Sequence, residues 1–423
     1  MARSIISPSP ESTESRGRSA VAVLSERNFG PYFLGNLLSN CGTWFQTIAQ
    51  ALLIYRLTNS TFLVGLVSFA QFAGVILLVP WSGAAADRFD RKRLLIITQL
   101  VAVAISGVLA LLAAANHDTV AVVIGLAFVL GFTTAFSAPA AQAIVPSLVP
   151  KEDLQAAVSM NSVTFNLARA IGPVLGTLVV TKLGVPWAFG LNSLSYLALV
   201  AALLVIHPAP QVQRARAKPS FAESIGIVRR DGRLIALLGV VASVSFALDP
   251  VNVLSPAYAK QVFHRPDSLV GFLIGAFGTG AVIAAFTASG KTATPYRRIG
   301  IMLTLLTCGT IAYALVPVLA FAIAALMIGG FGYLAGQTRA NALLQTSVHD
   351  DQRGRVMALW SVCFLGARPV ASLIDGAISS VAGIHIATLV MAVPTAVAAV
   401  TMFTMHRCGV PVGMREEGAY GDA

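Results

Sequence analysis

Twelve runs of about 20 apolar residues follow one another along the chain, and each is long enough to cross a bilayer as a helix. Only 11% of the 423 residues are charged, whereas a soluble domain carries roughly 25%, so lipid must be the outer solvent. The sequence therefore predicts an all-α membrane protein. Its predicted spans are Pro31 to Tyr55, Thr61 to Ala86, Leu94 to Ala115, Val120 to Ala140, Leu154 to Thr181, Pro186 to Ile206, Leu234 to Tyr258, Ser268 to Ala288, Ile299 to Val316, Val318 to Leu344, Val356 to Ala382 and Ile384 to Met405.

Positive charge is distributed unevenly between the two sides of the predicted membrane. One set of loops holds Arg56, Lys182, Lys260 and Arg265, while the loops on the side of the termini hold most of the 29 lysines and arginines. The positive-inside rule then predicts that both termini are cytosolic. This topology explains the net charge of +11, so the expected partner is the lipid bilayer and not a nucleic acid.

The two halves of the chain resemble each other. Leu63-Val64-Gly65 recurs as Leu269-Val270-Gly271 at a shift of 206 positions, and the polar segments at 150–153 and 350–353 recur at a shift of 200. Repeats of this kind place a binding site near the membrane midplane, between two bundles that rock against each other. The predicted divisions are a disordered cytosolic tail at 1–28, a six-helix bundle at 29–206, a basic cytosolic linker at 207–233, a second six-helix bundle at 234–406 and a cytosolic tail at 407–423.

The segment after the second run is the most specific motif in the chain. It reads GAAADRFDRKR over residues 83–93 and resembles the signature that the major facilitator superfamily carries between its second and third helices. Gly83 permits close helix contact, and Asp87 can lie at the positive N-terminus of a neighbouring helix. The resemblance implies a major facilitator fold in which Gly83, Asp87, Arg88 and Arg91 gate the cytosolic side. The alternative is a cluster of basic residues that only fixes the cytosolic end of a membrane helix, which requires neither Gly83 nor Asp87.

The fifth run contains a second motif, ARAIGPVLGT, at residues 168–177. It is similar to the antiporter motif of the same superfamily, in which Gly172 and Gly176 would form a small face for tight packing and Pro173 would allow a bend. The fourth run carries no arginine, whereas many proton-coupled drug exporters of the superfamily have one there. In its overall sequence pattern the chain is similar to the bacterial branch that contains enterobactin and macrolide exporters, and this resemblance implies transport out of the cytosol.

Five charged residues fall inside the predicted spans, where a charge is costly and often functional. They are Arg169, Asp249, Arg339, Arg368 and Asp375. Because removal from water disfavours an ionised carboxylate, Asp249 could bind and release a proton during transport; the alternative is a structural partner for an arginine. Arg368 and Asp375 share one helix face and would either pair with neighbours or handle substrate or protons. Arg339 could extend to water, whereas Arg169 would brace the bundle or contact substrate.

Polar side chains gather on one face of the first run, and a matching set lies in the seventh. In the superfamily these two helices line a central cavity, so the resemblance implies a cavity of mixed polarity. Hydrogen bonding between helices without a cavity is the alternative. The expected lining residues are Asn36, Asn40, Thr43, Gln46 and Thr47, with Ser245 and Asn252 beside Asp249 in the counterpart helix.

The sequence contains no Ser/His/Asp set, catalytic carboxylate pair, phosphate-binding loop or cysteine spacing typical of metal ligands. We therefore expect no enzyme activity, no cofactor and no metal. The expected protein is a monomeric secondary active transporter in the bacterial plasma membrane. It would export a small amphipathic molecule, drug-like or siderophore-like, by proton antiport with alternating access. An importer, or a non-transporting receptor or assembly protein on the same fold, are the alternatives.

Overall fold

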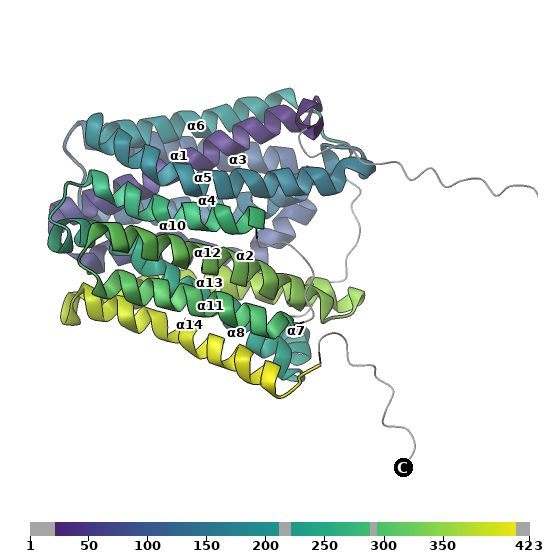
Figure 1. The fold of residues 1–423 in the computed structure, drawn as a ribbon. Coiled ribbons are helices and arrows are strands. Elements are labelled where there is room, and N and C mark those ends of the chain that lie inside the picture. The colour runs from purple at the N-terminus through teal and green to yellow at the C-terminus, as the bar shows by residue number, and fades with distance from the viewer. Residues whose placement is uncertain (1–21, 211–220, 288–293, 412–423) are drawn as a thin grey trace, which may run out of the picture.

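The computed structural model describes residues 22–210, 221–287 and 294–411. Most of each predicted tail, at 1–21 and 412–423, lies outside the described residues, as does the middle of the predicted linker at 211–220; residues 22–28 are described and begin with a 3-10 turn. All regular elements of the described part are helical (Figure 1). The first and last described segments lie at the same end of the assembly, which we call the terminal face, and the other end is the opposite face.

The first bundle consists of six long helices. Short 3-10 turns precede the first helix at Ala22–Ser25 and join the fourth and fifth at Val145–Ser147 and Lys151–Asp153. Because consecutive helices alternate in direction, each face collects every second loop. The helices are α1 (Phe29–Thr58), α2 (Thr61–Arg88), α3 (Arg91–Ala114), α4 (Val120–Ile144), α5 (Leu154–Lys182) and α6 (Val185–Val205).

The second bundle follows a short helix, α7 (Phe221–Arg229), and also contains six long helices. Its first long helix continues into a three-residue helix, α9 (Ser255–Ala257), and a π-helical turn, Tyr258–Val262. The long helices are α8 (Gly232–Val253), α10 (Ser268–Thr287), α11 (Pro295–Leu315), α12 (Leu319–Thr346), α13 (Asp350–Ala382) and α14 (Ile384–Arg407).

Eleven of the described helices are long and apolar enough to cross a membrane. The twelfth long helix, α1, has 30 residues, or about 45 Å at 1.5 Å per residue, but polar side chains interrupt its apolar character. The twelve predicted runs coincide with these twelve helices, which confirms the predicted fold class. Several helices are longer than predicted, and α13 begins at Asp350 and not at Val356, because a helix continues past the membrane wherever its backbone bonds are satisfied.

The helix packing is the same in both bundles. In the first, α1 packs against α5 and α6, α3 packs against α4 and α6, and α2 packs against α4. In the second, α8 packs against α13 and α14, α11 packs against α12 and α14, and α10 packs against α12. Each contact in one bundle has its counterpart in the other when α1 is matched to α8 and the remaining helices in order. The predicted pseudo-symmetry is therefore present in the packing.

Two helix pairs join the bundles, α2 with α13 and α5 with α10. Both junctions depend on glycines of the repeated Leu-Val-Gly triplets. A Cβ atom on Gly65 of α2 would overlap the carbonyl oxygen of Ser372 on α13, and one on Gly271 of α10 would overlap the carbonyl oxygen of Pro173 on α5. The repeat at a shift of 206 thus marks one place on each helix pair where a glycine lies directly against the backbone of the other bundle.

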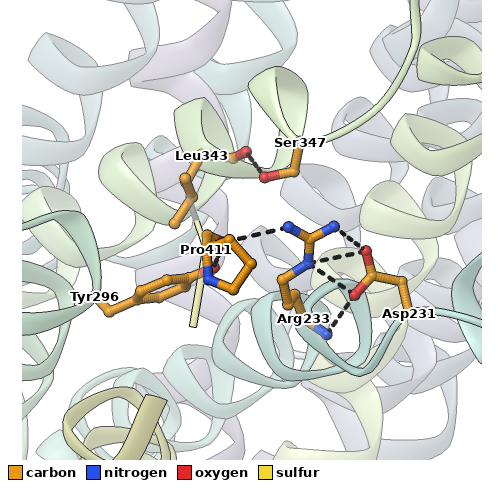
Figure 2. A network of polar contacts seen from close by, with 6 residues as sticks. All are labelled: Asp231, Arg233, Tyr296, Leu343, Ser347 and Pro411. Atoms are coloured by element: carbon orange, nitrogen blue, oxygen red, sulfur yellow. Dashed lines mark hydrogen bonds and ion pairs between the residues drawn. The ribbon is translucent and has the colours of Figure 1, made fainter. Parts of the chain in front are cut away.

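Aspartate side chains cap the starts of two helices at the terminal face, α3 and α8. Asp90 accepts a hydrogen bond from the backbone N–H of Arg93 at 2.7 Å, which caps α3. Asp231 caps α8 through the N–H of Arg233 at 2.9 Å and also binds the guanidinium of Arg233 at 2.6 Å (Figure 2). The same guanidinium and the hydroxyl of Tyr296 donate to the carbonyl of Pro411, at 3.2 and 3.3 Å. These contacts fasten the end of the described chain to α8 and α11.

Candidate transport site

The polar face of α1 makes most of its contacts inside the first bundle. The amide nitrogen of Asn36 donates to the side-chain oxygen of Asn161 on α5 at 3.0 Å. The hydroxyl of Thr43 lies 3.2 Å from that of Tyr196 on α6. Asn40 and Thr47 donate to carbonyls of α1 itself, at 2.7 and 2.9 Å. All four residues are half-buried, so they are partly accessible while bonded to protein.

Gln46 does not occupy the place expected of a cavity-lining residue. It is 1% exposed, and its side-chain oxygen accepts hydrogen bonds from Ser106 on α3 at 2.6 Å and from Asn192 on α6 at 2.7 Å. The expected cavity position of Gln46 is therefore corrected to a link between three helices. The polar face of α1 is wide, and the spacing of its residues does not show which of them contact helices of the first bundle and which lie outside those contacts.

The matching face of α8 is directed at α13. The hydroxyl of Ser245 donates to the carbonyl of Phe364 at 3.2 Å, and the hydroxyl of Ser372 donates to one carboxyl oxygen of Asp249 at 2.7 Å. Asn252 is half-buried and donates to the carbonyl of Leu248 at 3.5 Å. Asp249 itself is 5% exposed. It forms no ion pair with an arginine of the described residues, so its first polar partner is a hydroxyl.

Arg169 crosses from the first bundle to the second. It is 5% exposed, its guanidinium donates to the hydroxyl of Tyr333 on α12 at 3.1 Å, and it lies 4.8 Å from the centre of that ring. A guanidinium over an aromatic face gains electrostatic stabilisation, which is greater away from water. Arg169 is thus a contact between bundles.

The side chain of Arg368 extends in the other direction, from α13 of the second bundle to α2 of the first. Its guanidinium lies 4.9 Å from the ring centre of Phe72 on α2 and 5.6 Å from that of Phe364 on its own helix. Arg169 and Arg368 are 199 positions apart, each follows an alanine, and they occupy the equivalent helices α5 and α13. The shift of 200 between the polar segments nearby would place Arg169 opposite Pro369, one position from Arg368, so the match was missed by one residue.

The remaining intramembrane charges, Asp375 and Arg339, have different surroundings. Asp375 is fully buried and interacts electrostatically with Asp249. Arg368 also interacts with Asp249, and neither Arg368 nor Asp375 forms an ion pair with another of the described residues. Arg339 is half-buried in the part of α12 nearer the terminal face, where it lies close enough to Arg298 for mutual repulsion.

The loop motif lies where α2 ends and α3 begins. Gly83 and Asp87 are in the last turns of α2, and the surroundings of Gly83 and the side chain of Asp87 are outside the described part of the structure. Arg88 is exposed. Arg91 donates to the carbonyl of Ala143 near the end of α4 at 2.8 Å. A cation at a helix C-terminus is favourable because the last carbonyls carry partial negative charge, a role that sequence analysis did not assign to Arg91.

The motif on α5 packs that helix between two others. A Cβ atom on Gly172 or Gly176 would lie against Trp44 or Phe45 of α1, respectively. On the other side, the carbonyl of Pro173 faces Gly271 of α10. Small residues at this spacing allow α5 to contact its own bundle and the opposite one at the same level.

At the opposite face, polar contacts hold the bundles together. Arg56, at the end of α1, forms an ion pair with Asp267 at 2.7 Å. The hydroxyl of Tyr55 accepts a hydrogen bond from Gln261 at 2.9 Å. Nearby, the hydroxyl of Ser379 on α13 donates to a hydroxyl at the start of α2 at 2.7 Å. Together with the glycine junctions and the two arginines, these contacts extend from the opposite face to the middle of the helices.

Among the described residues, no three His, Cys, Asp or Glu side chains gather as metal ligands would. The chemistry available at the centre is that of two guanidinium groups, two carboxyl groups, aromatic rings and amides. Such a set can bind a mixed polar and apolar molecule and exchange protons.

This architecture, two six-helix bundles with the same packing joined around a polar centre, defines a membrane transporter of the major facilitator fold. A bacterial homolog to the human lysosomal transporter Spinster, in an inward-facing and occupied conformation, superposes with a TM-score of 0.72 at 14% identity, over 90% of this chain and 96% of that one. A D-xylose-proton symporter superposes with a TM-score of 0.69 at 15% identity, over 91% and 98%. The likeness to these structures concerns the fold.

The sequence comparison is more specific. Residues 18–419 match the model of the transmembrane secretion effector family, and the chain belongs to that family. It is 28% identical over 346 residues to the enterobactin exporter EntS of Shigella boydii serotype 4, covering 79% of this chain and 80% of that protein. The same exporter of Escherichia coli O139:H28 is 27% identical over the same length. The predicted family and the prediction of a transporter, not an enzyme, are confirmed.

Proposed function

We propose that this protein exports a small amphipathic molecule of the siderophore class across the bacterial plasma membrane. The proposal is supported by the relatives, which are exporters of enterobactin, and by the combination of arginines and aromatic rings at the centre of the molecule. Guanidinium groups suit anionic substituents, and ring faces suit the apolar parts of such a compound.

The terminal face is cytosolic in this proposal. The excess of lysine and arginine in the loops of that face supports the orientation. The opposite face is then external, and the contacts that join the bundles there exclude passage from outside in the present conformation. The observation that carries the proposal is the set of contacts that join the two equivalent bundles at the opposite face, because rocking about the central contacts would break them and open that face.

Export is driven by protons that enter as substrate leaves, with Asp249 as the coupling residue. Its position supports this role, since it lies inside the second bundle beside α13, where α13 also contacts the first bundle. A change in its charge would therefore act close to a junction that moves during transport. The lack of an arginine in α4 leaves the two carboxyl groups of the second bundle as the proton-binding candidates.

The test is a transport assay with the full chain in proteoliposomes of known orientation. Radiolabelled enterobactin and a panel of dyes are supplied on the side of the terminal face, with and without a proton gradient. We expect movement away from that face that depends on the gradient and is lost in Asp249→Asn. Asp118→Asn, the same chemical change in the loop between α3 and α4, is the control and retains flux. Movement in the other direction would indicate an importer, and no flux of any compound would contradict the proposal.

A further inference from the structure

Two carboxyl groups lie buried together in the second bundle with most of their oxygen atoms unpartnered. Asp249 on α8 is 5% exposed and Asp375 on α13 is 0% exposed. One oxygen of Asp249 accepts the hydrogen bond from Ser372 at 2.7 Å. The other oxygen of Asp249 and both oxygens of Asp375 have no hydrogen-bond partner among the described residues. Buried polar atoms are nearly always paired, so three unpaired oxygens at one place require an explanation.

An uncompensated pair of carboxylates would be unstable at this position. An ionised carboxylate in an apolar interior costs several kcal/mol unless it is paired, and two neighbouring ones repel each other. Among the described residues, no lysine or arginine lies within the 4.0 Å of an ion pair from either group. Arg368 interacts with Asp249 at longer range, but its guanidinium is placed over aromatic rings. A bound cation, such as a proton, is therefore needed to neutralise at least one of the two negative charges.

The other titratable groups around the pair do not supply that cation. Tyr258, in the π-helical turn, and Tyr313, on α11, both interact electrostatically with Asp375. Arg368 in turn interacts electrostatically with Arg169 of α5 and Tyr333 of α12. Tyrosine hydroxyls are neutral donors at physiological pH, so they can offer hydrogen bonds and transfer protons but cannot neutralise a carboxylate.

The tyrosines mark a polar path from Asp375 toward the opposite face. The rings of Tyr258 and Tyr313 are 4.3 Å apart, and the hydroxyl of Tyr313 is buried without a partner among the described residues. The hydroxyl of Tyr258 lies 2.9 Å from that of Thr388 on α14. The ring of His385, 5.6 Å from that of Tyr258, is at the start of α14, where the residue is exposed. This sequence of groups stays inside the second bundle and ends at water.

We propose that Asp249 and Asp375 form one proton-binding site, which holds a single proton in this conformation and is reached from the opposite face past Tyr258. The proton comes from water at that face and forms an O–H bond with one carboxyl oxygen, so the pair keeps one negative charge in place of two. Arg368 faces the remaining charge. From Asp375 to the opposite face the path runs through side chains of the second bundle, so protons enter without passing between the bundles. The inference rests on the proposed function, since it names the site that would couple export to protons.

The test reads proton occupancy directly and needs no substrate. The full chain is placed in lipid nanodiscs, and the carbonyl stretch of protonated carboxyl groups is recorded by infrared difference spectroscopy in H₂O and D₂O at neutral pH. We expect a band that shifts in D₂O and is lost in Asp375→Asn and in Asp249→Asn, while Asp118→Asn retains it. Ser372→Ala keeps both carboxyl groups and is expected to move the band, because the hydrogen bond to Asp249 is gone.

A wild-type protein without such a band, or a band unchanged in both asparagine variants, would overturn the inference. Thermal unfolding of each variant establishes that it is folded, and the Ser372→Ala variant decides the matter where an asparagine variant is not. Because no transport is measured, a protein that fails to export enterobactin can still carry the band, and an active exporter can lack it.

The path is tested by the rate at which the band shifts after transfer to D₂O. Tyr258→Phe removes the hydroxyl nearest Thr388, and we expect exchange roughly 100-fold slower, the low end of what a positioned proton-transfer group contributes. Tyr32→Phe is the matched control, since Tyr32 is 1% exposed in the first bundle and its hydroxyl donates to the carbonyl of Ala141. Equal exchange rates in the two variants would overturn the proposed entrance.

Discussion

Adding one methyl group at each glycine junction should open the face where the bundles are closed. Gly65 and Gly271 allow α2 and α10 to touch the other bundle, and a Cβ atom at either position would overlap a backbone carbonyl, which cannot rotate away as a side chain can. Overpacking of this kind costs about 1–3 kcal/mol. The cost exists only while the opposite face is closed, because separated bundles leave room for the methyl group.

The expected population shift follows from that cost. A penalty of about 1–3 kcal/mol on one of two states changes their ratio by roughly 5- to 150-fold. The junctions lie on different helix pairs and share no residue, so the penalties of Gly65→Ala and Gly271→Ala should add, to about 2–6 kcal/mol in the double variant. Even a protein that strongly favours the closed opposite face would then be largely open there.

The assay is a distance measurement by electron spin resonance in nanodiscs. Spin labels are attached at Leu183, between α5 and α6, and at Val318, between α11 and α12; these residues are 56% and 51% exposed at the opposite face. The four native cysteines are replaced beforehand. We expect a longer distance to gain population in each alanine variant, and most in the double variant.

Two matched controls separate this effect from a general response to alanine. A Cβ atom on Gly125 of α4 or Gly239 of α8 would meet no atom within 4 Å, so alanine there should leave the distances unchanged and slightly favour the helix. If the double variant keeps the distance distribution of the parent, the glycine contacts do not hold the closed state, and the account of the junctions is wrong.

Three further predictions concern single contacts. Arg56→Glu should also raise the open population, by the modest 0–1 kcal/mol or so of an exposed pair, and Asp267→Arg in the same chain should reverse it in the same distance measurement. Gln46→Leu should lower the free energy of unfolding by about 1–3 kcal/mol, since two buried donors lose their acceptor; unchanged thermal unfolding would contradict the three-helix link. Arg169→Lys should impair enterobactin export as severely as Arg169→Gln, because lysine lacks the planar group that stacks and donates at once, whereas full activity would mean that charge alone suffices.

The helices and their number could be predicted because each depends on a local pattern of apolar residues that lipid enforces. The pseudo-symmetry was predictable for a related reason: Gly65 and Gly271 recur where the backbone must approach another helix, and such positions retain their sequence. The family could be recognised from one loop motif, even though the side chain of Asp87 is outside the described residues.

The directions of polar side chains were harder to predict, because periodicity gives a helix face and not what that face contacts. Gln46 and Thr43 lie on one predicted face of α1, yet Gln46 binds α3 and α6 while Thr43 reaches only α6. The crossing of Arg169 to Tyr333 joins residues 164 positions apart. The charge of Arg368 suggested either a charged neighbour or a role in handling substrate or protons, and nothing in the sequence indicated that its guanidinium would lie over aromatic rings.

The two bundles share one packing plan but differ in their acids. Asp249 corresponds to Thr43 at the shift of 206, and Asp375 corresponds to Gly176 at the shift that relates the two arginines. In the proposed mechanism the second bundle therefore carries the proton-binding site, and the first bundle has no counterpart of it. The proton gradient would then act on the second bundle alone, and the first bundle would move only through its contacts with the second.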